Sequence, residues 1–206
     1  MNDAQPHAII HPRLEQALKM PRIAIESTQP VLEGGRFAAK ATIGHPINVT
    51  SKIFADGHDQ LAASICWRTK DETTWRRARL KLIGNDSWEG QFTPTQVASH
   101  EFMIEAWWDI YETYRYELSK KHNAGVPVQL ELEEGRRLVE QAAERSEGLL
   151  KTSLTAVLEQ FQLAQQPADR VALLLGSDTV KLMQEADNRP HLTRSDVLYP
   201  LDVERL

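Results

Sequence analysis

Cysteine and long apolar runs are nearly absent from this sequence, and each absence excludes a class of protein. The single cysteine, Cys66, excludes an internal disulfide, which is typical of proteins from a reducing compartment. No window approaches the roughly 20 apolar residues that a membrane-crossing helix needs. Residues 1–21 also contain no apolar core of signal-peptide length. We therefore expect a cytoplasmic protein with no membrane partner.

An excess of basic residues is also lacking. Twenty-four Lys and Arg stand against 29 Asp and Glu, which gives a formal net charge of -5. Nucleic-acid binding depends on a concentrated basic surface that neutralises phosphates. The balance therefore argues against a nucleic-acid partner, although basic residues gather locally at Arg76, Arg77, Arg79 and Lys81.

Motifs for catalysis are absent as well. The sequence has no nucleophile elbow, phosphate-binding loop, CxxC pair or HExxH helix. Asp56, His58 and Asp59 bring carboxylates and an imidazole together around Gly57, but a metal site would need further ligands at defined spacing. Turn formation is the other interpretation of this loop. From the residues alone we predict a soluble, non-catalytic module with no cofactor, no metal and no catalytic residue.

Short alternating segments dominate the first half of the chain. Strands are predicted at residues 22–26, 36–43 and 47–53, and further strands follow up to a weaker one at Tyr111–Tyr116. In the segment His100 to Asp109, one face carries Phe102, Ile104, Ala106 and Trp108. The opposite face carries Met103, Glu105 and Trp107. Many short strands at close spacing favour an immunoglobulin-like antiparallel β-sandwich.

The hydrophobic period changes after Gly125. Helices are predicted at about residues 128–146 and 152–164, at a segment that starts with Pro167, and at a last one that reaches about Ala186. Residues after Pro190 are predicted to be irregular. Two amphipathic helices cannot bury their apolar stripes against each other alone. We therefore expect the helices to pack on the sandwich or on a second copy.

Aromatic and apolar side chains on these predicted faces are candidates for an interface. Trp75, Arg77 and Trp107 lie on polar strand faces, where a protein partner, a stacked glycan and a plain solvated face are the alternatives. Trp67 and Trp108 lie on apolar faces and are predicted to be core residues. The helical stripe adds Leu154, Leu158 and Phe161. These six residues form the predicted interface: Trp75, Arg77, Trp107, Leu154, Leu158 and Phe161.

Several phrases of the sequence match one known family in order and spacing. They are LEGGRFAAKATIG (residues 32–44), IFADGHDQLAA (53–63), LIGNDSWEGQFTP (82–94), FMIEAWWDIYETYRYELSKKHNAG (102–125) and LELEEGRRL (130–138). Together they resemble the N-terminal region of the α-1,4-glucan:maltose-1-phosphate maltosyltransferases. The likeness covers residues 22–140 and continues weakly into the helices.

The resemblance implies a bacterial enzyme system of the α-amylase superfamily. Such enzymes transfer maltosyl units from maltose 1-phosphate to the non-reducing ends of α-1,4-glucans, on the route from trehalose to a glycogen-like polymer. An Asp nucleophile and a Glu acid/base act on a TIM barrel. The resemblance further implies that an N-terminal β-sandwich with a helical insert precedes this barrel, and that the inserts of two subunits pack as a bundle in a homodimer.

A TIM barrel takes about 250 residues, and the sequence ends roughly where that barrel would begin. We therefore expect a fragment that is inactive alone and that serves dimerisation and support of a barrel. The expected organisation is an arm at residues 1–21, a sandwich domain at 22–117, a helical insert at 118–190 and a linker towards the barrel at 191–206. The alternative is a stand-alone α-glucan-binding β-sandwich module.

Overall fold

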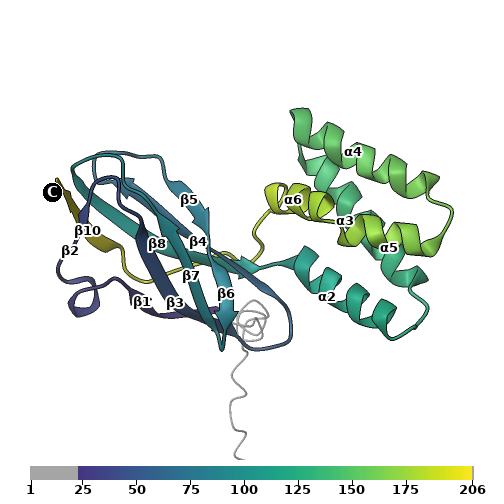
Figure 1. The fold of residues 1–206 in the computed structure, drawn as a ribbon, viewed down its shortest axis with the longest axis horizontal. Coiled ribbons are helices and arrows are strands. Elements are labelled where there is room, and N and C mark those ends of the chain that lie inside the picture. Colours follow the sequence, from purple (N-terminus) through teal and green to yellow (C-terminus); the bar gives the residue numbers. More distant parts are fainter. Residues whose placement is uncertain (1–22, 206) are drawn as a thin grey trace, which may run out of the picture.

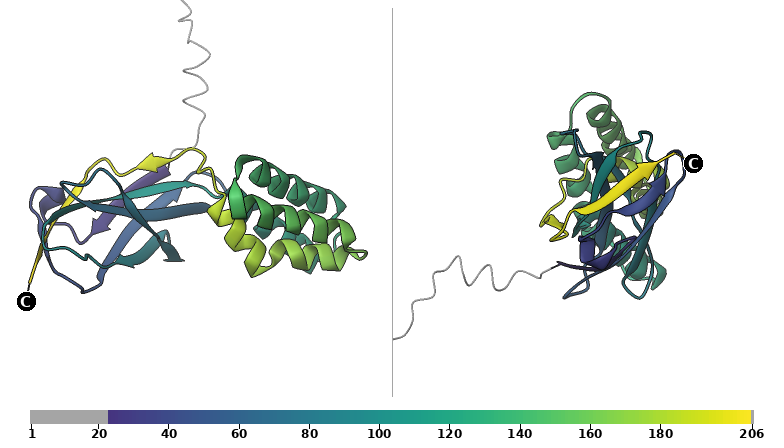
Figure 2. Two further views of the ribbon diagram at one scale, coloured as in Figure 1. Left: turned by 90° about the horizontal axis from the view of Figure 1, so that it is seen from above. Right: turned by 90° about the vertical axis from the view of Figure 1, so that its left-hand side faces the viewer.

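Residues 23–205 are described by the computed structural model, so the predicted arm at 1–21 lies outside the described residues. The chain forms a β-unit, built from strands β1–β10, and a helical unit, built from α2–α6. The two units lie end to end along the long axis of the molecule (Figures 1 and 2). The fold therefore combines β-sheets with a following set of helices, which confirms the predicted order of strands before helices.

The β-unit consists of two sheets. Its strands are β1 (Ile23–Gln29), β2 (Ala39–Thr42), β3 (Ile47–Ala55), β4 (Leu61–Thr69), β5 (Arg76–Arg79), β6 (Lys81–Gly84), β7 (Ser87–Phe92), β8 (Ser99–Trp108), β9 (Thr193–Arg194) and β10 (Tyr199–Glu204); a short 3₁₀ turn spans Glu33–Gly35. One sheet has the order β1-β3-β7-β6. The other has the order β2-β10-β8-β4-β5, with β9 paired to β8.

Alternation along the strands builds one core that both sheets share. Val49 and Ile53 of β3 face Ile65 of β4 and the β8 residues Phe102 and Ile104. Successive side chains of a strand point to opposite faces, so the alternation of apolar and polar residues in the sequence predicts these core positions. The core position of Trp108 is confirmed. Trp67 is half-buried and stacks on Phe92 with 4.8 Å between ring centroids.

The last described strand contradicts the predicted irregular tail. Residues 199–204 form β10, which inserts between β2 and β8 and runs parallel to β2 but antiparallel to β8. Leu201 and Val203 point into the core of the β-unit. Their spacing of two is a strand signal, and burial on that face holds the segment in the sheet.

The segment around Leu80 also differs from its prediction. The alternation of Ala78, Leu80 and Leu82 in the sequence predicts a single strand with these residues on one face. The chain instead passes from β5 in one sheet to β6 in the other at Leu80. Leu80 is buried in the core, but Leu82 is 53% exposed. A strand that changes sheets carries its later residues away from the original face, because each sheet has its own register.

The helical unit begins earlier than expected. Its helices are α2 (Ile110–Asn123), α3 (Gln129–Arg145), α4 (Gly148–Leu163), α5 (Pro167–Leu175) and α6 (Ser177–Glu185). The predicted strand at Tyr111–Tyr116 was wrong, because these residues form the first turns of α2. This helix continues past residue 117, where the boundary between the two domains was predicted. Asp109 caps this helix by accepting a hydrogen bond from the Glu112 backbone N–H at 2.9 Å.

Close approach of helices shapes the core of the helical unit. Tyr111, Tyr114 and Leu118 follow one another at helical spacing and are buried. A Cβ atom at Gly135 of α3 would lie 2.1 Å from the hydroxyl oxygen of Tyr114. The glycine, which loosens a helix in sequence terms, therefore lets α2 and α3 pack together. Within residues 23–205, no helix is long and apolar enough to cross a membrane.

Candidate functional site

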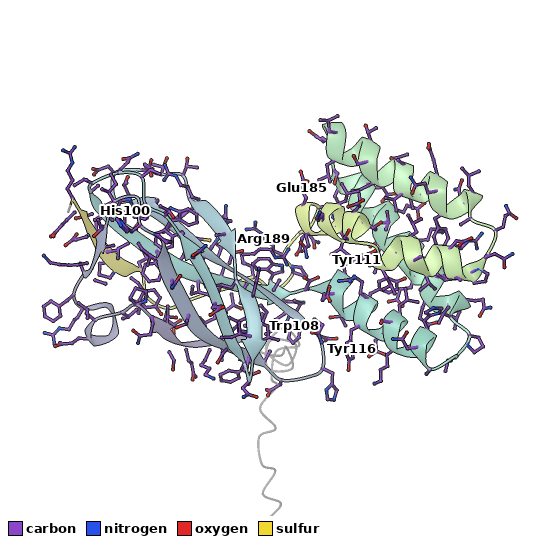
Figure 3. The ribbon with its side chains drawn as sticks, viewed as in Figure 1. His100, Trp108, Tyr111, Tyr116, Glu185 and Arg189 are labelled. Carbon is purple, nitrogen blue, oxygen red and sulfur yellow. The ribbon has the colours of Figure 1, made fainter. Side chains whose placement is uncertain are left out.

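A buried carboxylate organises the outer face of the sheet that contains β8. Glu105 is fully buried and forms ion pairs with Arg194 at 3.0 Å, Arg77 at 3.3 Å and Arg189 at 3.4 Å. Arg77 comes from β5, whereas Arg189 and Arg194 come from the segment that returns from α6. Figure 3 shows Arg189 between the β-unit and the helical unit. We call these four residues the Glu105 cluster.

The surroundings shift the pKa values of Glu105 and of its neighbour Cys66 in opposite senses. Burial raises the pKa of Glu105, but hydrogen bonds from Cys66, Arg194 and Arg77 outweigh it, so its pKa lies below the ordinary value. Burial, together with the charge of Glu105, raises the pKa of Cys66 to about 12. A carboxylate held ionised is a poor general acid, and a neutral thiol is a poor nucleophile. The cluster instead fastens the return segment onto the sheet.

Trp107 was predicted to be exposed, and that prediction is wrong. Its side chain is 2% exposed, and its indole N–H donates to a carboxylate oxygen of Asp187 at 2.6 Å. The guanidinium carbons of Arg189 and Arg79 lie 5.1 and 5.7 Å from the centre of its ring. The face of β8 was correctly predicted, but the return segment, some 80 residues later in the chain, covers it.

Trp75 and Arg77 keep part of their surface exposed. The guanidinium of Arg68 lies 4.3 Å above the ring of Trp75, which is half-buried as a result. Arg77 belongs to the Glu105 cluster, yet over a third of its side chain remains exposed. The structure thus brings Arg77 and Trp107 to the same sheet face, and leaves Trp75 and Arg77 with surface that a partner could contact.

The three helical candidates lie inside their own unit. Leu154 and Phe161 are buried, and Leu158 is partly buried against the same core. The helices were expected to pack on the sandwich or on a second copy, whereas α3, α5 and α6 of the same chain pack against α4. Exposed apolar side chains lie elsewhere in the helical unit: Leu149 lies in the first turn of α4, and others lie at the end of the unit away from the β-unit. There Val126 is half-exposed, Leu130 is 84% exposed and Leu163 is 76% exposed.

The loop of residues 56–60 lines a groove against α2. Its cavity volume is about 550 Å³, and its walls come from β3, this loop, the β6–β7 hairpin and α2. The loop supplies His58 and Asp59, and α2 supplies Tyr116, Glu117 and Lys120. Figure 3 shows Tyr116 on α2, beside the end of the β-unit.

The predicted turn loop thus gains neighbours that the sequence did not indicate. The sequence pattern had assigned Tyr116 to a strand. A helical reading of YETYRYELSKK would have placed Tyr116, Glu117 and Lys120 on adjacent positions of one helix surface. In the described part of the chain, no group of three or more His, Cys, Asp or Glu side chains is placed to hold a metal ion.

Comparisons with known proteins identify the chain's relatives. The family model for "Alpha-1,4-glucan:maltose-1-phosphate maltosyltransferase, domain N/S" matches residues 21–205. A maltosyltransferase of that name from Pseudomonas aeruginosa is 41% identical over 189 residues, covering 92% of this chain and 28% of the relative. One from Burkholderia pseudomallei is 40% identical over 192 residues, covering 92% of this chain and 17% of the relative.

A more distant relative agrees with these two. The α-1,4-glucan:maltose-1-phosphate maltosyltransferase 2 of Streptomyces coelicolor is 32% identical over 200 residues, covering 94% of this chain and 29% of the relative. The chain thus spans less than a third of the length of the curated relatives it matches.

Proposed function

Since the chain belongs to the α-1,4-glucan:maltose-1-phosphate maltosyltransferase family, as its domain N/S, we propose that it is the non-catalytic support and self-association region of such an enzyme. The maltosyl transfer named for the relatives then belongs to a longer protein, in which this region holds two subunits together in the cytoplasm. The β-unit is inferred to be an immunoglobulin-like sandwich, which accords with its two sheets around one core.

One observation carries the self-association. Leu130 and Leu163 are 84% and 76% exposed, and with Val126 they lie at the end of the helical unit away from the β-unit. The start of α3 and the end of α4 both lie at this end of the helical unit, where α5 also begins (Figure 1). Large apolar side chains exposed together are a feature of protein interfaces. We call these three residues the distal apolar end.

Sedimentation velocity over a concentration series tests this proposal. We expect wild-type chain to dimerise, and the double variant Leu130→Gln with Leu163→Gln to raise the dimer dissociation constant at least about tenfold. Leu149→Gln is the matched control, because Leu149 is 87% exposed at the opposite end of α4. A monomeric wild type, or a double variant that associates like the control, would contradict the proposal.

A separate experiment tests the proposal that the chain does not catalyse maltosyl transfer by itself. Incubation of the chain with maltose 1-phosphate and maltohexaose is expected to release no phosphate and to lengthen no oligosaccharide. Two observations support this expectation: the carboxylate of Glu105 is held in ion pairs with arginines, and the groove beside α2 is open to solvent. Phosphate release by the purified chain, lost on Glu105→Gln, would overturn the assignment.

A further inference from the structure

In the groove between the loop of residues 56–60 and α2, hydrogen bonds hold the loop backbone in place. The Gln60 backbone N–H donates to the Thr113 hydroxyl at 2.8 Å, and the Asp109 N–H donates to the Gln60 carbonyl at 2.9 Å. These bonds tie the loop to the first turn of α2. Binding residues often lie on loops that a rigid scaffold positions in this way.

The polar side chains of this loop are free to bind a ligand. Asp56, His58 and Asp59 are exposed and have no hydrogen-bond or ion-pair partner among residues 23–205. The turn itself is made by Gly57, whose φ of 116° is open to glycine but strained for other residues. The loop therefore keeps its shape through the backbone and through glycine, and its three polar side chains contribute nothing to that shape.

Aromatic rings complete the groove. Tyr116 of α2 is 52% exposed and Phe54 of β3 is 40% exposed, and both line the cavity. The ammonium of Lys120 lies 5.8 Å from the centre of the Tyr116 ring. A concave surface with apolar rings and a few polar groups, within the usual range of about 300–1,000 Å³, is the typical form of a small-molecule site.

The charges of the lining select the class of ligand. Asp59, Asp86 and Glu117 place three carboxylates around the groove against the single ammonium of Lys120. This balance repels phosphates and other anions. It suits hydroxyl groups, which can donate to carboxylates and accept from an ammonium or an amide. The C–H faces of a sugar ring are the apolar surface that Tyr116 and Phe54 can cover.

We propose that this groove binds a neutral saccharide, with Tyr116 as the stacking platform and Asp59 and Glu117 as acceptors for its hydroxyl groups. The choice of an α-1,4-linked glucan as that saccharide rests on the proposed function. The site differs from the earlier hypothesis of a glycan platform at Trp107, which is buried beneath the return segment.

A second concavity supplies the control. It has a volume of about 580 Å³ and is lined by Asn48, Thr50, Arg79, Lys81, Glu89, Gly90 and Gln91. Its lining is polar and charged and offers no ring on which a sugar could stack. A variant at exposed Gln91 therefore reports any effect of substitution that is unrelated to the proposed groove.

Titration of ¹⁵N-labelled chain with maltoheptaose tests the inference by NMR. We expect saturable shifts of the amide signals of residues 54–60 and 116–120, with a dissociation constant on the order of 1 mM. Tyr116→Ala is expected to weaken binding at least about tenfold, and Asp59→Asn or Glu117→Gln several-fold. Gln91→Ala should bind as the wild type does. These residues are exposed, so the variants should retain the wild-type spectrum elsewhere.

Each other result has a definite meaning. Absence of saturable shifts up to about 20 mM maltoheptaose, or wild-type binding by Tyr116→Ala, overturns the inference. Cellohexaose serves as the linkage control. Equal binding of cellohexaose supports a saccharide groove but overturns the α-1,4 assignment. Self-association is measured separately at the distal apolar end, so failure of the groove and failure of the proposed function are distinguishable.

Discussion

The β-unit and the helical unit achieve burial by different means. The β-unit has an apolar core between its sheets, and it also buries the outer face of β8 beneath the Glu105 cluster. The helical unit has a single apolar core, where close contact depends on the absence of a side chain at Gly135. The first arrangement depends on charge pairing, and the second depends on shape.

This difference predicts opposite sensitivities. Removing one ion from a paired, buried group leaves its partners uncompensated, so the β-unit should respond most to loss of charge. Packed helices respond most to added volume, because interiors are dense and absorb little. The substitutions below test this contrast, and hydrogen exchange can locate each effect in one unit or the other.

The largest effect is expected for Glu105→Ala. It leaves Arg77, Arg189 and Arg194 without their shared carboxylate, and because all three arginines keep some exposure, we expect a loss of about 3 kcal/mol in the free energy of unfolding. Urea unfolding measures this loss, and exchange should increase in β8 and β9 first. Lys40→Ala, which breaks an exposed ion pair with Glu204, is the control and should leave the midpoint unchanged.

The pH dependence of Glu105→Gln gives a sharper test. The folded pKa of Glu105 lies below its ordinary value of 4.5, so its contribution to stability is complete above that value and is lost as the pH falls through the folded pKa. The gap in unfolding free energy between the wild type and Glu105→Gln should therefore be largest near neutral pH and should shrink in acid. A gap that grows in acid would show that the carboxylate is not held ionised.

Gly135→Ala is expected to have the next largest effect, about 2 kcal/mol, and to act in the helical unit. The added methyl would meet the Tyr114 hydroxyl and the Leu174 side chain. The Tyr114 hydroxyl is buried with no hydrogen-bond partner in the described part of the chain, so Tyr114→Phe alone should be nearly neutral. In a double-mutant cycle, Tyr114→Phe should recover part of the loss. Strict additivity would mean that the contact does not limit packing.

Asp109→Ala should cost about 1 kcal/mol, because it removes the cap of α2 at the junction between the two units. Burial raises the pKa of Asp109, so a neutral side chain that can still cap is well tolerated there. Asp109→Asn is therefore expected to cost only a few tenths of a kcal/mol. Thermal unfolding compares the two variants, and equal losses would assign the effect to the ion pair with Arg79 instead.

Trp75→Ala is expected to cost about 0.5–1 kcal/mol, because it removes a half-buried contact with the guanidinium of Arg68. Trp107→Ala, on the covered part of the same sheet, should cost several times more because Trp107 is 2% exposed. Thermal unfolding of the two variants at the same protein concentration compares these losses of stability. Similar losses would mean that the return segment contributes little to stability.

Local patterns predicted most strands, the helices after Gly125 and the start of α5 at Pro167. They failed where distant residues decide the outcome. Alternation placed Glu105 and Trp107 on the correct face of β8, but it carried no sign that residues 187–194 return to cover that face. The groove was missed for a similar reason, because its walls come from the loop at 56–60 and from a helix that had been read as a strand.

Strand β10 has a consequence for how the molecule is made. It joins β2 to β8, and its Glu204 pairs with Lys40, 164 positions earlier. On a translating ribosome, the sheet edges of β2 and β8 must wait for the whole helical unit to emerge before their partner arrives. Unpaired edges are sites of aggregation. The edges of β2 and β8 are therefore open to other chains until β10 emerges. Fast, local folding of α2–α6 limits how long these edges stay unpaired afterwards.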